Sequence, residues 1–384
     1  MSVAGGSSTG SKRPTALFGP EPEAPSLTLE RTEGCRAWDA AGREYLDFVM
    51  ALGAVALGYA YPPVVEAATR AVTRGTVGSL PPAEEGRLAA LLHELMPWLE
   101  QVRFLKTGAE AVAAAVRLAR VVTGRDQVLG AGYHGWLDWC SRDAGVPAAV
   151  EGLFGELPFN DVARGRQAIA ARGSSLAAVV VEPVVDGAPS VEWLTMLREE
   201  TSRVGAVLVF DEIKTGLRIA LGGAAERWGV RPDLVVLGKA LANGFPLALV
   251  GGRREVMEAV SRTWISSTLA TESVALSAAI ATVEAARREA LPAHLGRVGG
   301  PLLAGFERLA ARAPGRITAA GIPEMCHLGF HDPADGGRVA RFCLSRGILF
   351  KRSAYNFVSL AHGPEEVERL LAVLDEALAR EVAC

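Results

Sequence analysis

The sequence predicts an α/β fold, in which a parallel sheet is covered by helices on both faces, followed by a smaller α+β region. Short apolar runs alternate with helical patterns of ten or more residues between positions 101 and 239, as parallel sheets require. The length of 384 residues favours one large domain and one smaller domain over a single core. The composition, 49% hydrophobic and 22% charged, is typical of a well-packed globular protein.

The first hundred residues precede the alternating region. Small, polar and proline residues at positions 1–26 predict a loose N-terminal arm. The stretch "CRAWDAAGREYLDFV" (35–49) predicts a hairpin, because two apolar-alternating runs flank the turn-forming residues at 39–42. Apolar residues at three-to-four spacing then predict helical structure over 62–99.

The middle of the chain carries the α/β alternation. Strands are predicted at 101–107, 126–132, 176–185, 206–212 and 233–239, and helices at 108–124 and 191–205. A long helix at 272–291 leads to the smaller C-terminal region. In that region we expect a helix from about Pro301, short strands within 324–332 and 348–362, and a final helix over 364–382.

Composition also excludes several classes of function. The net charge is −3 and no run of basic residues is present, which argues against nucleic-acid binding. The five cysteines are scattered without metal-ligand spacing, so no metal site is expected. No uncharged apolar stretch reaches the length of a membrane span, and no signal-peptide pattern begins the chain. We therefore expect a cytoplasmic protein that binds no membrane.

Polar residues follow several predicted strands at the point where each strand ends. Glu182, Asp211 and Lys239 close three strands, and Thr107 with Gly108 closes a fourth. In parallel α/β sheets, chemistry gathers beyond the carboxyl ends of the strands. Each residue taken singly is equally well explained as a cap or turn residue, but together they predict one crevice.

Lysine is rare in this chain, which has five, so a lysine directly after a buried strand suggests a task that arginine cannot perform. A desolvated lysine can lose its proton and attack a carbonyl as a neutral amine. Asp211 follows "AVLVF" and requires a cationic partner or a raised pKa. A protonated pyridine nitrogen would be such a partner, and Lys239 with Asp211 thus fits pyridoxal 5'-phosphate (PLP). Lys214, in the loop "EIKTG", is the rival for the reactive lysine.

The remaining parts of a PLP site are matched by weaker signals. The helix start "TGAEAVAAAVRLAR" offers backbone N–H groups for a phosphate. Tyr133 could stack on the cofactor ring, with an ordinary loop tyrosine as the alternative. His134 is assigned to cofactor binding without an acid–base role, with a structural histidine as the alternative.

These residues lie in motifs that resemble the class III aminotransferases, and most closely the glutamate-1-semialdehyde aminomutase branch. The stretches are "VEPVVDG", "LVFDEIKTGLRIALGG", "PDLVVLGKALANGFPLALVGGRREVM" and "FVSLAHGPEEVERLL", and the similarity runs from about Leu27 to Leu374. The resemblance implies a fold-type I PLP transferase with a mostly parallel seven-stranded sheet. It implies domains at 61–295 (PLP-binding) and 296–384 (small), with 1–60 packing on the small domain, and a homodimer with active sites at the interface.

The resemblance also implies roles for single residues. Lys239 corresponds to the Schiff-base lysine, Asp211 to the partner of the pyridine nitrogen, and Glu182 to an acid close to cofactor and substrate. The other matches are Tyr133 as the stacking aromatic, Thr107, Gly108 and Ala109 as the phosphate loop, and Thr268 as the threonine that completes the neighbouring subunit's phosphate site.

The substrate side departs from the family pattern. The phosphate loop reads Thr-Gly-Ala where Ser-Gly-Thr is usual, and Lys106 replaces an asparagine, either near the phosphate or pointing away. "MALGAVALG" replaces a Ser-Trp-Gly-Pro pattern, so Ala51, Leu52 and Ala54 favour a substrate with an apolar body. The lid region 143–161 is short, and a second shortening lies between the stretches 314–330 and 335–347. Arg31, Arg218 and Arg352 are candidate carboxylate clamps or ordinary surface residues.

A short lid retains an intermediate poorly, which favours an aminotransferase. Such an enzyme acts between a separate small-molecule amino donor and carbonyl acceptor, through internal aldimine and pyridoxamine forms. The alternatives are an aminomutase, another PLP carbanion reaction such as decarboxylation or bond formation, and a catalytically silent partner subunit. The sequence does not name the donor or the acceptor.

Overall fold

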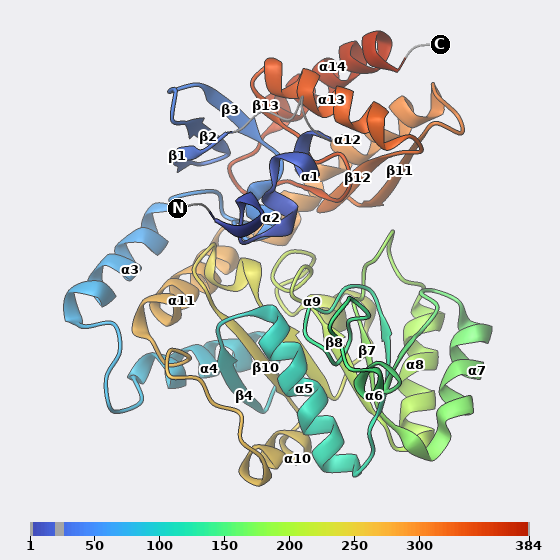
Figure 1. Cartoon of the computed structure of the whole chain (residues 1–384). Helices are drawn as coiled ribbons and strands as arrows, with labels where there is room; N and C mark the ends of the chain where they lie inside the picture. Colours follow the sequence, from blue (N-terminus) through green and yellow to red (C-terminus); the bar gives the residue numbers. More distant parts are fainter. Residues whose placement is uncertain (1–2, 20–26, 383–384) are drawn as a thin grey trace. The chain divides into compact units, whose positions relative to one another are not determined.

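The computed structural model describes residues 3–19 and 27–382, and the chain forms two compact units (Figure 1). One unit spans Pro62–Glu289. The other combines Met1–Tyr61 with Ala290–Cys384. Among the described residues, no helix combines the length and the apolar character that crossing a membrane requires.

The unit of residues 62–289 is built on a seven-stranded sheet, in the order β4-β10-β9-β8-β7-β5-β6. The strands are β4 (Gln101–Leu105), β5 (Gln127–Ala131), β6 (Phe154–Glu156), β7 (Leu176–Val181), β8 (Val207–Asp211), β9 (Leu234–Leu237) and β10 (Ala248–Gly252). β10 is antiparallel to both of its neighbours, and the other pairs are parallel. The predicted mostly parallel sheet is confirmed.

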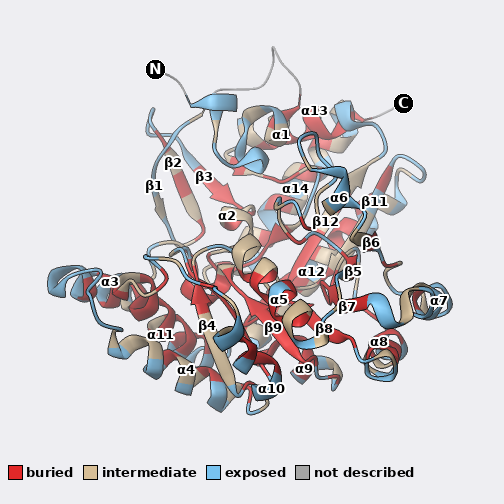
Figure 2. Ribbon diagram, turned by 60° about the horizontal axis from the view of Figure 1, so that its bottom comes forward, coloured by how far each residue is buried: buried red, intermediate tan, exposed pale blue. Residues whose placement is uncertain are grey.

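Helices cover both faces of this sheet. They are α3 (Pro62–Arg74), α4 (Ala83–Leu95), α5 (Gly108–Thr123), α6 (Ala148–Glu151), α7 (Val162–Arg172), α8 (Val191–Val204), α9 (Gly223–Trp228), α10 (Arg254–Met257) and α11 (Ser273–Arg288), with short 3₁₀ turns η3 (Gly173–Ser175), η4 (Lys239–Ala242) and η5 (Glu258–Arg262). Alternate residues of β9 belong to two apolar clusters, one under α5 and one under α4 and α11. The strands are accordingly buried on both faces (Figure 2).

Local sequence explains where the long helices begin and end. Thr107 caps α5 through a capping box with Glu110, and Gly124 ends the helix in the left-handed conformation. The Ser190 hydroxyl caps α8 by accepting a hydrogen bond from the Trp193 backbone N–H, and Gly205 ends this helix. The predicted strands and helices of the middle region are therefore confirmed within a few residues at their ends.

Three elements of this unit had no clear sequence signal. β10 reads "ALVGG", and its two glycines weaken the β pattern. The close approach of neighbouring chain explains one of them, because a Cβ on Gly251 would lie 2.8 Å from the carbonyl oxygen of Gln101. β6 has only three residues, and α7 carries little apolar periodicity.

The other unit contains two small sheets. β1 (Leu29–Glu33), β2 (Arg36–Asp39), β3 (Glu44–Asp47) and β13 (Ile348–Leu349) form one, and β11 (Ile317–Ile322), β12 (Met325–Phe330) and β14 (Asn356–Phe357) form the other. The predicted hairpin is β2–β3, and β3 pairs in parallel with β13 from the far end of the chain. The helices are α12 (Leu291–Ala311), α13 (Pro333–Ser345) and α14 (Pro364–Glu381), together with short turns near the N-terminus.

Two predictions for this unit require correction. The helix expected from about Pro301 begins ten residues earlier and continues through that proline, with buried leucines on its inner face. The arm expected to be loose is ordered over residues 3–19, in η1 (Ala4–Gly6), η2 (Gly10–Lys12) and α1 (Pro14–Phe18). Phe18 is buried, and Nη1 of Arg341 donates a hydrogen bond to its carbonyl oxygen at 2.7 Å. Positions 1–2 and 20–26 of the arm lie outside the described residues.

The segment predicted to line a substrate pocket forms α2 (Met50–Gly53), a single turn with unusual backbone. Met50, Ala51 and Leu52 have φ values of 45°, 50° and 60°, in the left-handed region that ordinary residues avoid. A Cβ on Gly53 would lie 2.7 Å from the ring of Phe357, so that position requires glycine.

Candidate active site

The carboxyl ends of four strands bring polar residues to one edge of the large sheet. Glu182 follows β7 directly, Asp211 is the last residue of β8, and Lys239 lies two residues after β9. These three strands are neighbours and run in parallel. Thr107 follows β4, which points the same way because β10 is antiparallel to both β4 and β9.

Ile213 links three of these segments. A Cβ on Gly108, at the start of α5, would lie 2.5 Å from Cδ1 of Ile213, and a Cβ on Gly238 would lie 3.6 Å from its Cγ1. The side chain therefore sits between the helix start and the residue before Lys239. These strand-end segments, which the sequence predicts to form one crevice, are thus neighbours in the structure.

Lys239 is half-buried and opens the 3₁₀ turn η4 with φ of 46°, a strained conformation for a residue with a side chain. Burial lowers the pKa of its amine from 10.5 to about 8, and the positive charge of Lys214 contributes to the decrease. The negative charges of Glu182 and Asp211 act in the opposite direction. A substantial share of this lysine is neutral near pH 8.

Asp211 is buried and held from two directions. Its Oδ2 lies 2.8 Å from Nδ1 of His134, which is also buried, and its Oδ1 accepts a bond from the backbone N–H of Ile213 at 3.3 Å. Nε2 of His134 has no hydrogen-bond partner among the described residues. In the structure His134 contacts Asp211, and its predicted contact with the cofactor stays a prediction.

Glu182 is buried and connects two loops. Its Oε1 lies 2.9 Å from Nζ of Lys214, and its Oε2 accepts a bond from the backbone N–H of Tyr133 at 2.9 Å. Burial raises the pKa of Glu182, and the charge of Lys214 opposes that rise. The ring of Tyr133 is exposed, beside a pocket of about 310 Å³ that His134 also lines.

The phosphate loop predicted from sequence lies at the start of α5. Thr107 is exposed and its hydroxyl is engaged with Glu110 in the capping box. The amides of Gly108 and Ala109 have no acceptor within the helix, because the first N–H groups of any α-helix lack one. A Cβ on Gly135 would lie 2.7 Å from Cβ of Ala109, so the Tyr133 loop and the start of α5 are adjacent.

Other predicted residues have different surroundings. Thr268 is exposed on the loop before α11. Arg31 pairs with Glu33, and Arg352 donates to backbone carbonyl groups, both in the other unit. Only Arg218 is fully buried near Lys239, whose pKa its charge lowers.

Lys106 does not serve the helix start directly. Its Nζ lies 2.6 Å from Oε1 of Glu272, and that carboxylate also accepts bonds from the first amides of α11. Both side chains are mostly buried. The sequence left open whether Lys106 lies near the phosphate or points away. In the structure its side chain forms an ion pair that joins the end of β4 to the start of α11.

Sequence reasoning missed two residues in the loop after β8. Lys214 was considered only as a rival for the reactive amine, yet it forms the ion pair with Glu182. Glu212 is buried, accepts bonds from Ala224 N–H and the Thr215 hydroxyl, and has a pKa raised to about 7 by burial. The signal was the string "DEIKTG", with three charged residues directly after a buried strand.

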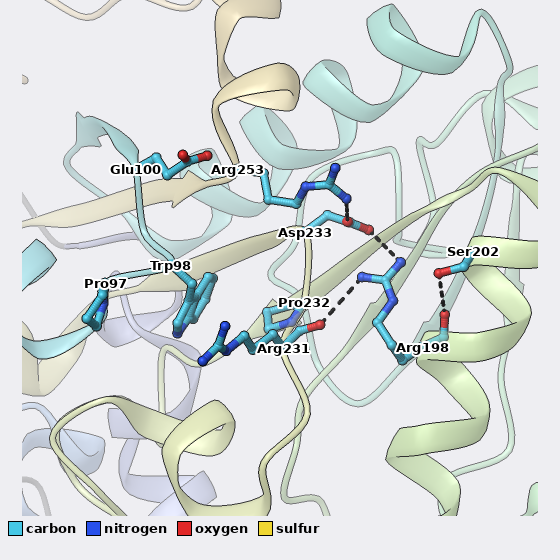
Figure 3. A pocket seen from close by; sticks show the side chains of 9 residues that line it. All are labelled: Pro97, Trp98, Glu100, Arg198, Ser202, Arg231, Pro232, Asp233 and Arg253. Atoms are coloured by element: carbon cyan, nitrogen blue, oxygen red, sulfur yellow. Dashed lines mark hydrogen bonds and ion pairs between the residues drawn. The ribbon is translucent and has the colours of Figure 1, made fainter.

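A second hollow lies at the opposite edge of the sheet and has a different character. It measures about 400 Å³ and is lined by Trp98, Arg198, Arg231, Asp233, Arg253 and neighbouring residues (Figure 3). Asp233 accepts from the Leu208 amide at 2.8 Å and pairs with Arg198 at 3.0 Å and Arg253 at 2.9 Å. This acid is fully engaged, which indicates a structural ionic cluster at this edge. The described residues contain no group of acids, histidines or cysteines arranged to hold a metal.

Comparison with known proteins gives one consistent result. The family profile described as Aminotransferase class-III matches residues 18–364. A curated relative, glutamate-1-semialdehyde 2,1-aminomutase of Thermomicrobium roseum, is 36% identical and the alignment covers 97% of this chain and 95% of the relative.

Two solved structures extend the comparison. The PLP internal aldimine form of FumI from Sphingopyxis sp. MTA144 superimposes with a TM-score of 0.88 at 28% identity, covering 95% of this chain and 90% of that one. An omega-transaminase from Sphaerobacter thermophilus gives 0.87 at 29% identity, covering 96% and 94%.

Proposed function

The chain belongs to the class III aminotransferase family, and we propose that it is a PLP-dependent aminotransferase acting between a small-molecule amino donor and a carbonyl acceptor. The observation that carries this proposal is the placement of the Lys239 amine and the buried Asp211 carboxylate at the ends of neighbouring strands. A fold-type I α/β architecture surrounds them.

The residues at this edge fit PLP. A partly neutral amine, a buried carboxylate and a helix start with free amides match the aldehyde, the ring nitrogen and the phosphate of that cofactor. Nδ1 of His134 lies 2.8 Å from Oδ2 of Asp211, so the protein itself supports one oxygen of this carboxylate. Lys239, Asp211, Gly108 and Ala109 are the residues that would hold the group.

Each residue has a distinct task in this proposal. When bound, PLP supplies an aldehyde and a ring that takes up an electron pair. Nζ of Lys239 would hold that aldehyde as a neutral amine nucleophile and, once released, would take a proton from the substrate carbon and return it to a neighbouring carbon. Asp211 stabilises a positive charge on the ring nitrogen, and His134 keeps the carboxylate in place.

An aminomutase is the second candidate, because the curated relative at 36% identity carries that name. Its alignment with this chain runs over 422 positions, although the chain has 384 residues, so the relative has segments that this chain lacks. Sequence analysis places shortened segments at the lid region 143–161, where the structure has only α6 and β6. A reduced lid favours exchange of separate partners over retention of one intermediate.

Product analysis separates the two candidates. Purified protein loaded with PLP would be mixed with single amines, including glutamate, amino sugars and ω-amines, and the absorption spectrum and carbonyl product recorded. An aminotransferase releases one carbonyl per cofactor converted and then requires a keto acceptor. Isomerisation of glutamate-1-semialdehyde without any acceptor would instead establish the aminomutase, and release of carbon dioxide a decarboxylase.

A lysine control identifies the anchor. Lys239→Ala is expected to lose cofactor absorbance and turnover, whereas Lys12→Ala, at an exposed position of the other unit, is expected to keep both. Cofactor absorbance that is unchanged in Lys239→Ala would refute the assignment. If wild-type protein shows no such absorbance after addition of PLP, the chain is a catalytically silent partner.

We also propose that the chain forms a homodimer. Leu80, Trp136 and Trp264 are large apolar side chains in the unit of residues 62–289, and they are 82%, 72% and 81% exposed. Contact with a second copy would remove such surface from water. Light scattering after gel filtration tests this, and a monomer at micromolar concentration would contradict it.

A further inference from the structure

The loop after β8 places a second lysine within the proposed site. Nζ of Lys214 lies 2.9 Å from Oε1 of Glu182, and the two side chains are 16% and 5% exposed. The other carboxylate oxygen of Glu182 is occupied by the Tyr133 amide. Lys214 therefore pairs with the acid that follows β7, and the pair lies next to Lys239, whose charge state both groups influence.

Two lysines and two acids lie in this site, and within the described part of the chain only one of the lysines, Lys214, has an acid as its ion-pair partner. The charged groups that act on Lys239 are Glu182 after β7, Asp211 at the end of β8, and Lys214 and Arg218 in the following loop. Asp211 is bonded to His134, and Glu182 to Lys214. Among the described residues, neither acid forms an ion pair with Lys239, and the ammonium of Lys214 disfavours a second positive charge beside it.

We propose that Lys214 is a positioning residue. Its ammonium pairs with Glu182 and supplies the positive charge of the site, so the amine of Lys239 stays neutral. A neutral amine is the form that attacks an aldehyde and accepts a proton from carbon. A cation beside a reactive lysine is a known means of obtaining that form near neutral pH. This inference rests on the proposed function only in taking Lys239 as the acting amine.

The charge of Lys214 and its anchoring of Glu182 can be separated by substitution. Lys214→Gln keeps an N–H donor for Oε1 of Glu182 but has no charge. Lys214→Arg keeps the charge, and Lys214→Met removes both donor and charge. Glu182→Gln removes the negative charge and is expected to act on Lys239 in the opposite direction to the neutral variants.

The test is made on the full-length apoprotein, so that no cofactor or turnover is involved. Trace acetic anhydride would be reacted at a series of pH values from about 6 to 11, which brackets the ordinary lysine pKa. Mass spectrometry then gives the titration midpoint of each lysine separately. The chain has only five lysines, and Lys351, which is buried in the other unit, is the internal control.

The midpoint of Lys239 is expected near pH 8 in the wild-type protein. Lys214→Gln and Lys214→Met should raise it by about one pH unit, because a like charge that acts on Lys239 is lost. Lys214→Arg should restore the wild-type value, and Glu182→Gln should lower it. The midpoint of Lys351 should stay constant in all variants.

Two results would overturn the inference. If Lys214→Gln titrates like the wild-type protein, the charge of Lys214 has no influence and the residue only anchors Glu182. If Lys214, and not Lys239, has the low midpoint, the roles are reversed. Circular dichroism and thermal melting show which variants fold, and Lys214→Gln decides the question if Lys214→Met does not. Failure of the aminotransferase assay would leave these midpoints unaffected, so the two proposals fail independently.

Discussion

Nδ1 of His134 lies 2.8 Å from Oδ2 of Asp211, and both side chains are almost completely buried. The contact fixes the carboxylate, because its other oxygen has only a long bond to a backbone amide. A buried acid that is well held keeps its orientation without help from a ligand.

Loss of this contact should weaken cofactor binding. His134→Leu is expected to raise the dissociation constant for PLP by about tenfold, which corresponds to roughly 1.4 kcal/mol for a hydrogen bond to a charged group. His134→Asn keeps an N–H near the place of Nδ1 and should recover most of the affinity. Absorbance titration of the apoprotein measures both, and equal affinity in the leucine variant and the wild-type protein would contradict the role.

Gly132 should be required for the position of Glu182. Its φ is +104°, and a Cβ there would lie 2.5 Å from Oε2 of Glu182. Gly145 has a similar φ of +102° with nothing within 4 Å, so Gly145→Ala should show the backbone cost alone, about 1 kcal/mol. Gly132→Ala should cost about 2 kcal/mol more, because the carboxylate must leave the Tyr133 amide. Urea unfolding compares the two, and equal losses would disprove the contact.

The charge state of Lys239 should be visible in the stability of the apoprotein. Its pKa is about 8 in the folded state, lowered by burial from 10.5. Between these values the unfolded chain binds a proton that the folded protein has released, so the free energy of unfolding rises with pH across this window. The wild-type protein should gain about 2 kcal/mol from pH 8 to 10.5 relative to Lys239→Met. Urea titrations at several pH values would show parallel curves if the amine has an ordinary pKa.

The ionic cluster at the opposite edge of the sheet should affect stability alone. Asp233→Asn weakens the pairs with Arg198 and Arg253 and the bond to the Leu208 amide. We expect a loss of about 2 kcal/mol in the free energy of unfolding, because a mostly buried, fully bonded carboxylate is replaced. PLP affinity of the folded variant should remain within about twofold. A tenfold loss of affinity would show that this edge communicates with the other.

Much of the architecture could be predicted because each part had a local cause. Asp211 and Lys239 follow apolar strands, and the rule that parallel strands end at one edge was sufficient to bring them together. Their chemical roles stay predictions until the variants are measured. The resemblance of the motifs predicts the family, and the family match confirms it.

The features that could not be predicted depend on side chains distant in sequence. Lys106 pairs with Glu272, which lies more than a hundred and fifty positions away in the sequence. No local pattern shows that the end of β4 meets the start of α11. Lys214 could be seen in its loop, but its partner depends on the path of that loop past β7. The proline inside α12 was taken as a helix start, because a single proline more often ends or begins a helix than lies within it.

The parallel pair of β3 with β13 has a consequence for biosynthesis. Leu46 faces Ile348, so about 300 residues must be translated between one strand and its partner. At usual elongation rates this takes roughly 15 to 60 s. The unit of residues 62–289 is one continuous stretch of chain, and all of it is translated in that interval. The hairpin β2–β3 is therefore made early but receives its parallel partner late, and the nascent chain exposes the unpaired edge of β3 throughout that interval.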